Sequence, residues 1–281
     1  MMHDSEKQQW GKREGYGGPG SFPREVMGFV RQRSGALAGK EYSLYLSDGR
    51  VLHYAFTDTE VLTMKSVDGG HGFNAEGVKY RAFEGAPGVF IVSHGYPVHA
   101  RLNTSLVLDL DRKQVIVVDD EIPGEGDADF RVRESRAGGC IGKPASAEAI
   151  IPPPFAADLV GRRFTVNYAD IYTYEIVFLS SKHLAWHCFK GNPGLAAIEE
   201  YAASQLTPGV VCLSWSEQAE SLAAVMLMNF SDGKINGNMF GYDPENQEIL
   251  NFALGSEMID SAEYGVNVRG LNAASTGRCN T

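Results

Sequence analysis

The sequence predicts an all-β protein made of two homologous halves in tandem, each a set of short antiparallel strands. The stretch Pro208–Trp215 (PGVVCLSW) has an echo far upstream in Pro87–His94 (PGVFIVSH). Pro-Gly marks a turn, and the apolar run after it is typical of a strand that is buried on both faces. Strand sets of this kind close into an up-and-down barrel or pack as a sandwich. We expect barrels, because closure removes exposed strand edges.

Composition limits the classes of function. The chain has 281 residues, 43% of them apolar, which is enough for one large all-β domain or two ordinary ones. A net charge of -10 gives no electrostatic help in binding nucleic acid or anionic lipid, so we expect neither as a partner. No apolar run approaches the roughly 20 residues of a membrane span, and the polar N-terminus lacks the apolar core of a signal peptide. We therefore expect a cytoplasmic protein with free thiols, since none of its cysteines has C-x-x-C spacing.

The first half begins after a polar, Gly-rich tail over 1–35, and the first barrel repeat is predicted over 36–120. Asp48-Gly49 is typical of a hairpin turn, because Gly accepts a positive φ. The strands of this repeat are predicted at 40–46, 50–57, 61–67, 79–83, 87–94, 103–110 and 114–118.

The connection between the repeats is predicted over 121–155. It follows an acidic run, contains Gly-rich stretches, and ends in three prolines that cannot join a ladder. The second repeat is expected over 156–257 and a C-terminal tail over 258–281. Within the second repeat, Pro193–Ser204 predicts a helix because it is rich in Ala and Glu and has apolar residues at helical spacing. A last strand is predicted over 246–254.

The two halves align along most of their length. An offset of 122 places Leu37 on Leu159 (159 - 37), the Pro-Gly strands align at 121 (208 - 87), and Leu108 meets Met228 at 120 (228 - 108). Three blocks in the same order, with a drift of two positions, indicate an internal duplication. Coincidence between generic strands is the alternative, since β-rich chains share propensities.

The second half resembles the MoaF family, whose members are linked by name to molybdenum cofactor biosynthesis and have two related calycin-like halves. The residues that carry the resemblance are Leu159, Gly161, Arg162, Phe164, Asp170, Tyr174, Phe178, Leu184, Trp186, Pro208, Gly209, Val210, Ser214 and Trp215. The first half has a weaker version, with Met64 at the place of Trp186 and His94 at the place of Trp215. The resemblance covers about 37–255 and implies two calycin/lipocalin-like barrels. It extends more distantly to phenolic acid decarboxylases, which bind a small aromatic acid inside a single barrel, and it implies a barrel more than a reaction.

The interior of a barrel is the place for a small ligand. Strand alternation puts Tyr172 and Tyr174 on one face, and if that face lines the barrel, they join Trp186 and Trp215 in an aromatic lumen. We predict that Tyr172, Trp186 and Trp215, with Tyr54 in the first half, bind substrate and that Tyr174 has a catalytic role. An ordinary aromatic core is the alternative.

Two polar features are candidates for chemistry. The densest polar patch follows the first Pro-Gly strand, where His94 and His99 are predicted to move protons and Arg101 to hold an anionic group. A solvated hairpin end is the alternative. Glu217 follows Trp215 by two residues on the same strand face. If that face is internal, its carboxyl group is predicted to act as a general acid or base. The alternative is a loop carboxylate.

Other titratable residues are weaker candidates. His53 and Glu175 occupy matching positions opposite the aromatic face, so we expect both to point outward. His183 and His187 share a strand face, but no third ligand lies beside them, so no metal site is predicted. The chain has no dinucleotide fingerprint, P-loop or nucleophile elbow, and no cofactor is implied.

The predicted function is binding of a small, partly aromatic or anionic biosynthetic intermediate in a barrel pocket, with conversion of the lyase, isomerase or cyclase type and no cofactor. The alternative is a non-catalytic, lipocalin-like carrier or an accessory protein of MoaF type, and a scaffold with filled barrels is a third option. A small molecule is the expected partner, and a homodimer is left open.

Overall fold

The computed structural model describes residues 29–67, 74–124, 131–168, 172–191, 193–217, 221–243 and 247–260, with side chains through 258. Among these residues, no helix combines the length and the apolar character needed to cross a membrane. Cys140, Cys188 and Cys212 form no disulfide in the described part of the chain, and Cys279 lies outside the described residues.

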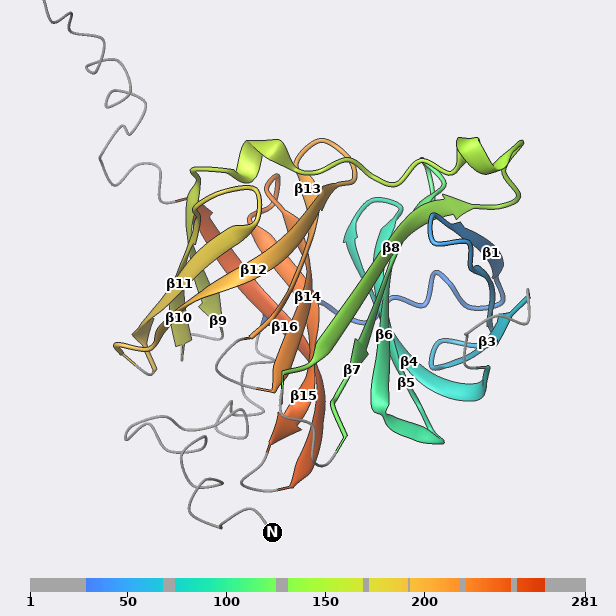
Figure 1. Ribbon diagram of the computed structural model, residues 1–281, viewed down its shortest axis with the longest axis horizontal. Helices are drawn as coiled ribbons and strands as arrows, with labels where there is room; N and C mark the ends of the chain where they lie inside the picture. The colour runs from blue at the N-terminus through green and yellow to red at the C-terminus, as the bar shows by residue number, and fades with distance from the viewer. Residues whose placement is uncertain are drawn as a thin grey trace, which may run out of the picture.

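The described chain forms two closed antiparallel barrels of eight strands each, which stand side by side in Figure 1. The strands of the first barrel are β1 (Glu41–Leu46), β2 (Val51–Phe56), β3 (Val61–Ser66), β4 (Ala75–Ala86), β5 (Val89–Tyr96), β6 (His99–Asp109), β7 (Gln114–Glu121) and β8 (Arg133–Ile141). Those of the second are β9 (Arg163–Tyr168), β10 (Tyr172–Phe178), β11 (His183–Lys190), β12 (Ala196–Gln205), β13 (Val210–Ser216), β14 (Leu222–Asn229), β15 (Lys234–Asp243) and β16 (Glu248–Asp260). The predicted fold class, an all-β pair of calycin-like barrels in tandem, is confirmed.

The duplication is visible in the strand register. Tyr54 pairs with Met64 in the first barrel, and Ile176 pairs with Trp186 in the second, an offset of 122 for both partners (176 - 54 and 186 - 64). Farther along the chain, β4 pairs with β5 as β12 pairs with β13, at an offset of 121. The two backbones therefore share most of their strand register, although bulges such as that between Leu62 and Met64 occur in one barrel only.

The helix predicted over 193–204 is wrong, because this segment forms strand β12. Its residues pair with both β11 and β13, and the inward positions include Glu199, Tyr201 and Ala203. The Ala and Glu content favours a helix locally, but pairing on both edges of the strand satisfies the backbone and overrides that propensity.

The eighth strand of each barrel was missed or cut short by sequence reasoning. Strand β8 lies inside the stretch predicted as connection, and it closes the first barrel by pairing Leu44 of β1 with Ile141. Strand β16 runs past 257 and pairs with β9 in the same way. The β8 sequence RESRAGGCI lacks an apolar run, and its glycines allow close contact. A Cβ on Gly139 would overlap the carbonyl oxygen of Tyr45 in the adjacent strand.

The true connection is shorter than predicted and contains two 3-10 turns, η3 (Ala147–Ala149) and η4 (Ala157–Leu159). In Figure 1 it runs over the upper ends of both barrels. Strand β8 ends where this connection begins, and β9 starts where it finishes, so the connection lies at one common end of the two barrels.

The barrels pack through their outer faces. Apolar side chains from β4 to β7 meet those of β12 to β16, with Phe83 and Val107 on one side and Leu206 and Leu227 on the other. This junction is separate from the two lumens, each of which has its own apolar core.

Two arginines cross the junction with hydrogen bonds. Arg81 of β4 donates to the side-chain oxygen of Asn238 at 2.8 Å and to the main-chain oxygen of Asn251 in β16 at 3.1 Å. Arg136 of β8 donates to the hydroxyls of Ser214 at 2.8 Å and of Ser204 in β12 at 2.9 Å. The contact is reciprocal. Strand β4 of the first barrel meets β16 of the second, and the equivalent strands, β12 of the second barrel and β8 of the first, also meet, as in a two-fold dimer.

Closure by β8 makes Gly139 a stringent position. We expect Gly139→Ala to lower the free energy of unfolding by about 2 kcal/mol or more, because an added methyl group at a packed backbone crossing forces a shift. Urea unfolding followed by circular dichroism measures the change. Ser135→Ala, at an exposed position of the same strand, is the control and should stay within about 0.5 kcal/mol of wild type. Equal stability of the two variants would contradict the role of Gly139 in closure.

Candidate functional site

Each barrel contains a cavity at the end opposite the connection. In the second barrel the cavity includes Tyr168, the last residue of β9, and Glu217, just after β13. In the first barrel it includes Arg50, just before β2, and Asp119, near the end of β7. The two cavities therefore occupy equivalent positions in the duplicated fold.

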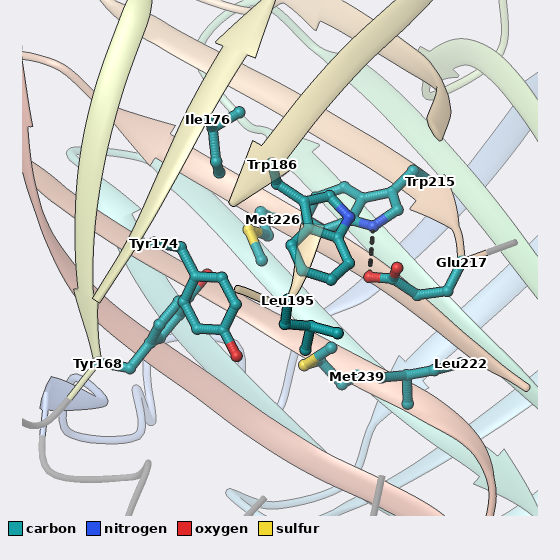
Figure 2. Close-up of a pocket in the computed structure, with 10 residues that line it drawn as sticks. All are labelled: Tyr168, Tyr174, Ile176, Trp186, Leu195, Trp215, Glu217, Leu222, Met226 and Met239. Atoms are coloured by element: carbon teal, nitrogen blue, oxygen red, sulfur yellow. Dashed lines mark hydrogen bonds between the residues drawn. The ribbon is translucent and has the colours of Figure 1, made fainter. Parts of the chain in front are cut away.

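The cavity of the second barrel is small, apolar and aromatic, with a volume of about 50 Å³ (Figure 2). Its lining consists of Tyr168, Tyr174, Ile176, Trp186, Leu195, Trp215, Glu217, Leu222, Met226 and Met239. Figure 2 shows the two tryptophans and Glu217 at one side and the two tyrosines at the other. A cavity of this size holds a few water molecules, since one water needs about 10–15 Å³ by the same measure.

A carboxylate lies inside this aromatic lumen. Glu217 is 7% exposed, and its Oε1 accepts a hydrogen bond of 2.9 Å from the indole Nε1 of Trp215. Burial raises the pKa of the neighbouring Tyr168, and the charge of Glu217 raises it further. Both effects disfavour the phenolate, so Tyr168 stays a neutral hydroxyl at physiological pH.

The rings around Glu217 pack edge to face. Tyr174 contacts Trp186 with ring centroids 5.8 Å apart and Tyr168 with centroids 5.6 Å apart, both T-shaped. The side chain of Trp186 is buried, and its Nε1 has no hydrogen-bond partner among the described residues. A buried N–H without an acceptor costs free energy, so this donor favours an additional group in the cavity.

Sequence reasoning located most of this lumen. Tyr174, Trp186, Trp215 and Glu217, all predicted as site residues, line one cavity. Tyr172 is half-buried beside Tyr174, with ring centroids 6.3 Å apart, and packs at the edge of the core without lining the cavity. The catalytic and binding roles of these residues stay predictions.

The cavity of the first barrel is larger and more polar, with a volume of about 260 Å³. Its lining consists of Arg50, Leu52, Tyr54, Met64, Tyr96, Leu102, Asn103, Thr104, Asp119, Asp120, Glu121, Arg133, Glu134 and Ser135. Met64 occupies the position that Trp186 takes in the second barrel (186 - 122 = 64), which accounts for part of the extra room.

A chain of hydrogen bonds runs along the wall of this cavity. The Tyr96 hydroxyl lies 2.8 Å from Thr104 Oγ1, which donates to Asp119 Oδ1 at 2.6 Å. Asp119 Oδ2 accepts from Arg50 at 2.6 Å, and Arg50 also donates to Asp48 at 2.7 Å. Arg50 and Asp119 are thus held at the rim of the cavity as an ion pair.

His94 and Tyr54 form a second polar pair deeper in the first barrel. His94 Nε2 lies 3.1 Å from the Tyr54 hydroxyl, and both side chains are fully buried. Burial lowers the pKa of His94 to about 4, so the imidazole is neutral at physiological pH. Tyr54 lines the cavity and His94 lies behind it. Sequence reasoning named both residues but not their contact.

The predicted grouping of His94 with His99 and Arg101 is wrong. His99 is exposed, and Arg101 lies at the outer face, where it donates to the carbonyl oxygen of Pro123 and sits 5.8 Å from the ring centroid of Tyr242 in the second barrel. His94 pairs with Thr104 and shares its lumen side, whereas Arg101 lies three residues before Thr104 in β6 and faces outward by strand alternation.

Two acidic residues meet where the first cavity borders the junction between the barrels. Asp120 of β7 pairs across the ladder with Glu134 of β8, and both line the cavity. Burial raises the pKa of both groups, and the charge of Glu134 raises that of Asp120 further. Asp120 Oδ1 and Glu134 Oε2 have no hydrogen-bond partner among the described residues.

Several functional candidates escaped sequence reasoning. Arg50 was predicted only as the first residue of a strand, and Asp119 was assigned to an acidic run before the connection. Alternation along β7 places Asp119 on the lumen side with Val115 and Val117. Glu199 is fully buried in the second barrel but fell in the predicted helix. Extending the strand alternation from residue 114 to residue 121 would have identified Asp119 as a lumen residue. Glu199 carried no recognisable signal.

The remaining predictions concern the outer surface and metals. His53 and Glu175 lie on outer strand faces, where His53 contacts Glu41 at 3.5 Å and Glu175 pairs with Arg163. The side chain of His183 contacts the hydroxyl of Ser180 on the outer face of the barrel. Within the described part of the chain, no group of three His, Cys, Asp or Glu side chains is arranged to hold a metal ion.

Comparisons with known proteins identify both halves. The MoaF N-terminal domain family matches residues 21–124, and the MoaF C-terminal domain family matches residues 153–263. No curated protein matches the chain significantly. Among solved structures, a protein from Burkholderia vietnamiensis, provisionally named as a beta-lactamase, is 17% identical, with 39% of this chain and 99% of that chain covered and a TM-score of 0.31. A likeness this low carries no argument about fold or activity.

The buried imidazole makes the first barrel sensitive to acid. In the unfolded chain His94 binds a proton near pH 6.5, but in the folded chain it does so only near pH 4, so its contribution to stability is present above pH 6.5 and lost as pH falls. From pH 7.5 to pH 5 we expect wild type to lose about 2 kcal/mol more than His94→Gln. Urea unfolding at both pH values measures the difference. A parallel loss in the two proteins would contradict a buried neutral imidazole.

The acidic pair, Asp120 and Glu134, is expected to change stability with pH in the opposite direction to His94. Because the pKa of Asp120 is raised in the folded chain, folding is progressively disfavoured as pH rises above about 4. We expect Asp120→Asn, which mimics the protonated acid, to unfold at higher temperature than wild type at pH 8, with the gap closing towards pH 4. Glu121→Gln, at the exposed neighbour, is the control. A gap that does not depend on pH would show that Asp120 is ionised in the folded protein.

Proposed function

Because the chain belongs to the MoaF family, we propose that it binds a small, partly aromatic intermediate of molybdenum cofactor biosynthesis in the first barrel and converts it with its own side chains. The reaction would be of the lyase, isomerase or cyclase type. The link to cofactor biosynthesis comes from the name of the family, and the choice of the first barrel comes from the cavity volumes.

The observation that carries the proposal is the difference in cavity volume. The first barrel holds about 260 Å³ and the second about 50 Å³. An apolar cavity of 150 Å³ takes up benzene, and ligand pockets usually measure about 300–1,000 Å³. A small molecule with one ring therefore fits the first barrel, whereas the second cannot take a ring unless its walls move.

The lining favours a neutral or basic ligand over an anionic one. Four carboxyl groups and two guanidinium groups line the cavity, and Arg50 is already paired with both Asp48 and Asp119. Leu52, Met64 and Leu102 provide the apolar wall for a ring.

Proton transfer is the chemistry that this lining supports. Tyr54 lines the cavity, and its hydroxyl contacts the neutral imidazole of His94, which can accept its proton or relay one. Tyr96, Thr104 and Asp119 form the second hydrogen-bonded path to the rim. Tyr54 would be the group that touches the substrate, and His94 would position and assist it.

A non-catalytic carrier is the second candidate. It is favoured by the fact that Arg50 and Asp119, the charged pair at the rim, are already satisfied by each other and by neighbours. A lumen whose polar groups are engaged in the protein's own network can bind by shape and burial without performing chemistry.

The duplication offers a matched variant for testing the binding site. Met64→Trp introduces the residue that the second barrel already tolerates at the equivalent position, and it should fill the first cavity. With benzylamine as the probe, we expect saturable binding to wild type by isothermal titration calorimetry and at least tenfold weaker binding to Met64→Trp. Met64→Leu, of similar volume, is the control. Unchanged binding to Met64→Trp would place the ligand outside the first barrel.

The charge preference and the chemistry are tested separately. Benzyl alcohol and benzoate replace benzylamine in the same titration, and benzoate should bind most weakly; tightest binding of benzoate would overturn the charge argument. Turnover is followed by mass spectrometry after wild type and Tyr54→Phe are incubated with a cell extract of small molecules. An enzyme depletes a compound that Tyr54→Phe spares, whereas a carrier binds without depleting any.

A further inference from the structure

The second barrel combines two features that the proposed function leaves unused: a cage of four aromatic rings and one buried carboxylate. We propose that this cavity is a separate site for a small organic cation of the methylammonium class, held by Glu217 and by the rings of Trp186, Trp215 and Tyr174.

The lining has the chemistry that recognises a cation. The face of an aromatic ring carries negative potential, Trp most strongly, and attracts an ammonium group within about 6 Å of the ring centroid. Two tryptophans and two tyrosines line the cavity with Glu217, and no Lys, Arg or His is found among the described residues of that lining. Cation–π contacts are strongest in a desolvated site, and a carboxylate adds direct charge attraction.

The carboxylate is held in a fixed place. Trp215 donates its indole N–H to Glu217 Oε1 at 2.9 Å, so the residue that forms one wall of the cage also orients the anion. Figure 2 shows this bond at the side of the cavity where Trp186 lies. The site is therefore preorganised, and binding a cation there needs little rearrangement of the anion.

A second, independent observation points to an occupant. Trp186 is 8% exposed, lines the cavity, and has an Nε1 without an acceptor among the described residues. A water molecule that enters with the cation, or an oxygen on the ligand, would satisfy it. An apolar filler would leave this donor unpaired, so a purely hydrophobic occupant is disfavoured.

The internal duplication shows that the cage belongs to the second barrel alone. The positions of Tyr168, Tyr174, Trp186, Trp215 and Glu217 correspond to 46, 52, 64, 94 and 96 (168 - 122, 174 - 122, 186 - 122, 215 - 121 and 217 - 121). Those positions hold Leu46, Leu52, Met64, His94 and Tyr96. All five differ although the strand register is repeated, so the fold itself does not require the cage or its carboxylate.

The volume sets the size of the ligand. About 50 Å³ is a third of the cavity that takes up benzene. Methylammonium fits this space, whereas tetramethylammonium, which is close to benzene in size, does not. The site would therefore discriminate by the number of methyl groups as well as by charge.

The experiment titrates the full chain with methylammonium chloride at constant ionic strength and follows tryptophan fluorescence and calorimetric heat. We expect saturable binding to wild type, at least tenfold weaker binding to Glu217→Gln, and severalfold weaker binding to Trp186→Phe, which keeps a ring but loses the N–H. Circular dichroism checks that each variant is folded. Should Glu217→Gln fail to fold, the Trp186→Phe result and the ligand series decide.

The ligand series separates recognition of a small cation from unselective uptake of any small molecule. Methanol, a neutral analogue, and tetramethylammonium should bind at least tenfold more weakly than methylammonium. Saturating benzylamine, too large for this cavity, should leave methylammonium binding unchanged, so failure of the first-barrel proposal would not affect this result. Equal binding of methanol, unchanged affinity in Glu217→Gln, or the absence of saturable binding would each overturn the proposal.

Discussion

The closure of each strand set on itself is the constraint on which the rest of the structure depends. Once β8 pairs with β1 and β16 with β9, side chains alternate strictly between a lumen and an outer face. Asp119 and Asp120 are neighbours in the chain, but their side chains lie in different surroundings. Asp119 joins the network of the first lumen, and Asp120 lies beside Glu134 near the second barrel. The chemistry available to each residue is therefore decided by strand register.

Because the two barrels share most of their strand register, their different interiors arise mainly from side chains. Trp186 fills space in the second barrel that Met64 leaves open in the first. His94 with Tyr54 forms a neutral hydrogen-bonded pair, whereas Trp215 at the position of His94 holds the carboxylate of Glu217. The first lumen is the larger and more polar, and the second is a compact aromatic cage. Duplication followed by divergence of lining residues accounts for both.

Sequence reasoning reached the fold and one of the two cavities because both depend on local periodicity. The repeated Pro-Gly strands revealed the duplication, and alternation around Tyr174 and Trp215 identified the lining of the second barrel. It failed where pairing with distant strands decides the structure. The Ala- and Glu-rich segment of β12 favours a helix until strands on both sides satisfy its backbone.

The same limit explains the errors in the first barrel. Strand β8 has little apolar character because it crosses close to β1 through Gly139 and uses its outward side chains, such as Arg136, in the junction with the second barrel. Nothing local distinguishes such a strand from a linker. Arg101 was assigned to the site because it lies near His94 in the chain, but alternation along β6 puts it on the face opposite to Thr104, the ladder partner of His94.

The reciprocal packing of the barrels explains how one chain can hold two different sites. Strand β4 meets β16 as β12 meets β8, so each half covers an apolar face of the other, as the subunits of a two-fold dimer do. The halves therefore depend on each other for stability. Their lumens do not meet in this contact, because the junction uses outward side chains and the connection lies at the end opposite the cavities. A substitution inside one lumen can change its volume or charge while the backbone of the other stays in place. The two interiors can therefore differ, with Trp186 and Glu217 in one barrel and an open, polar cavity in the other.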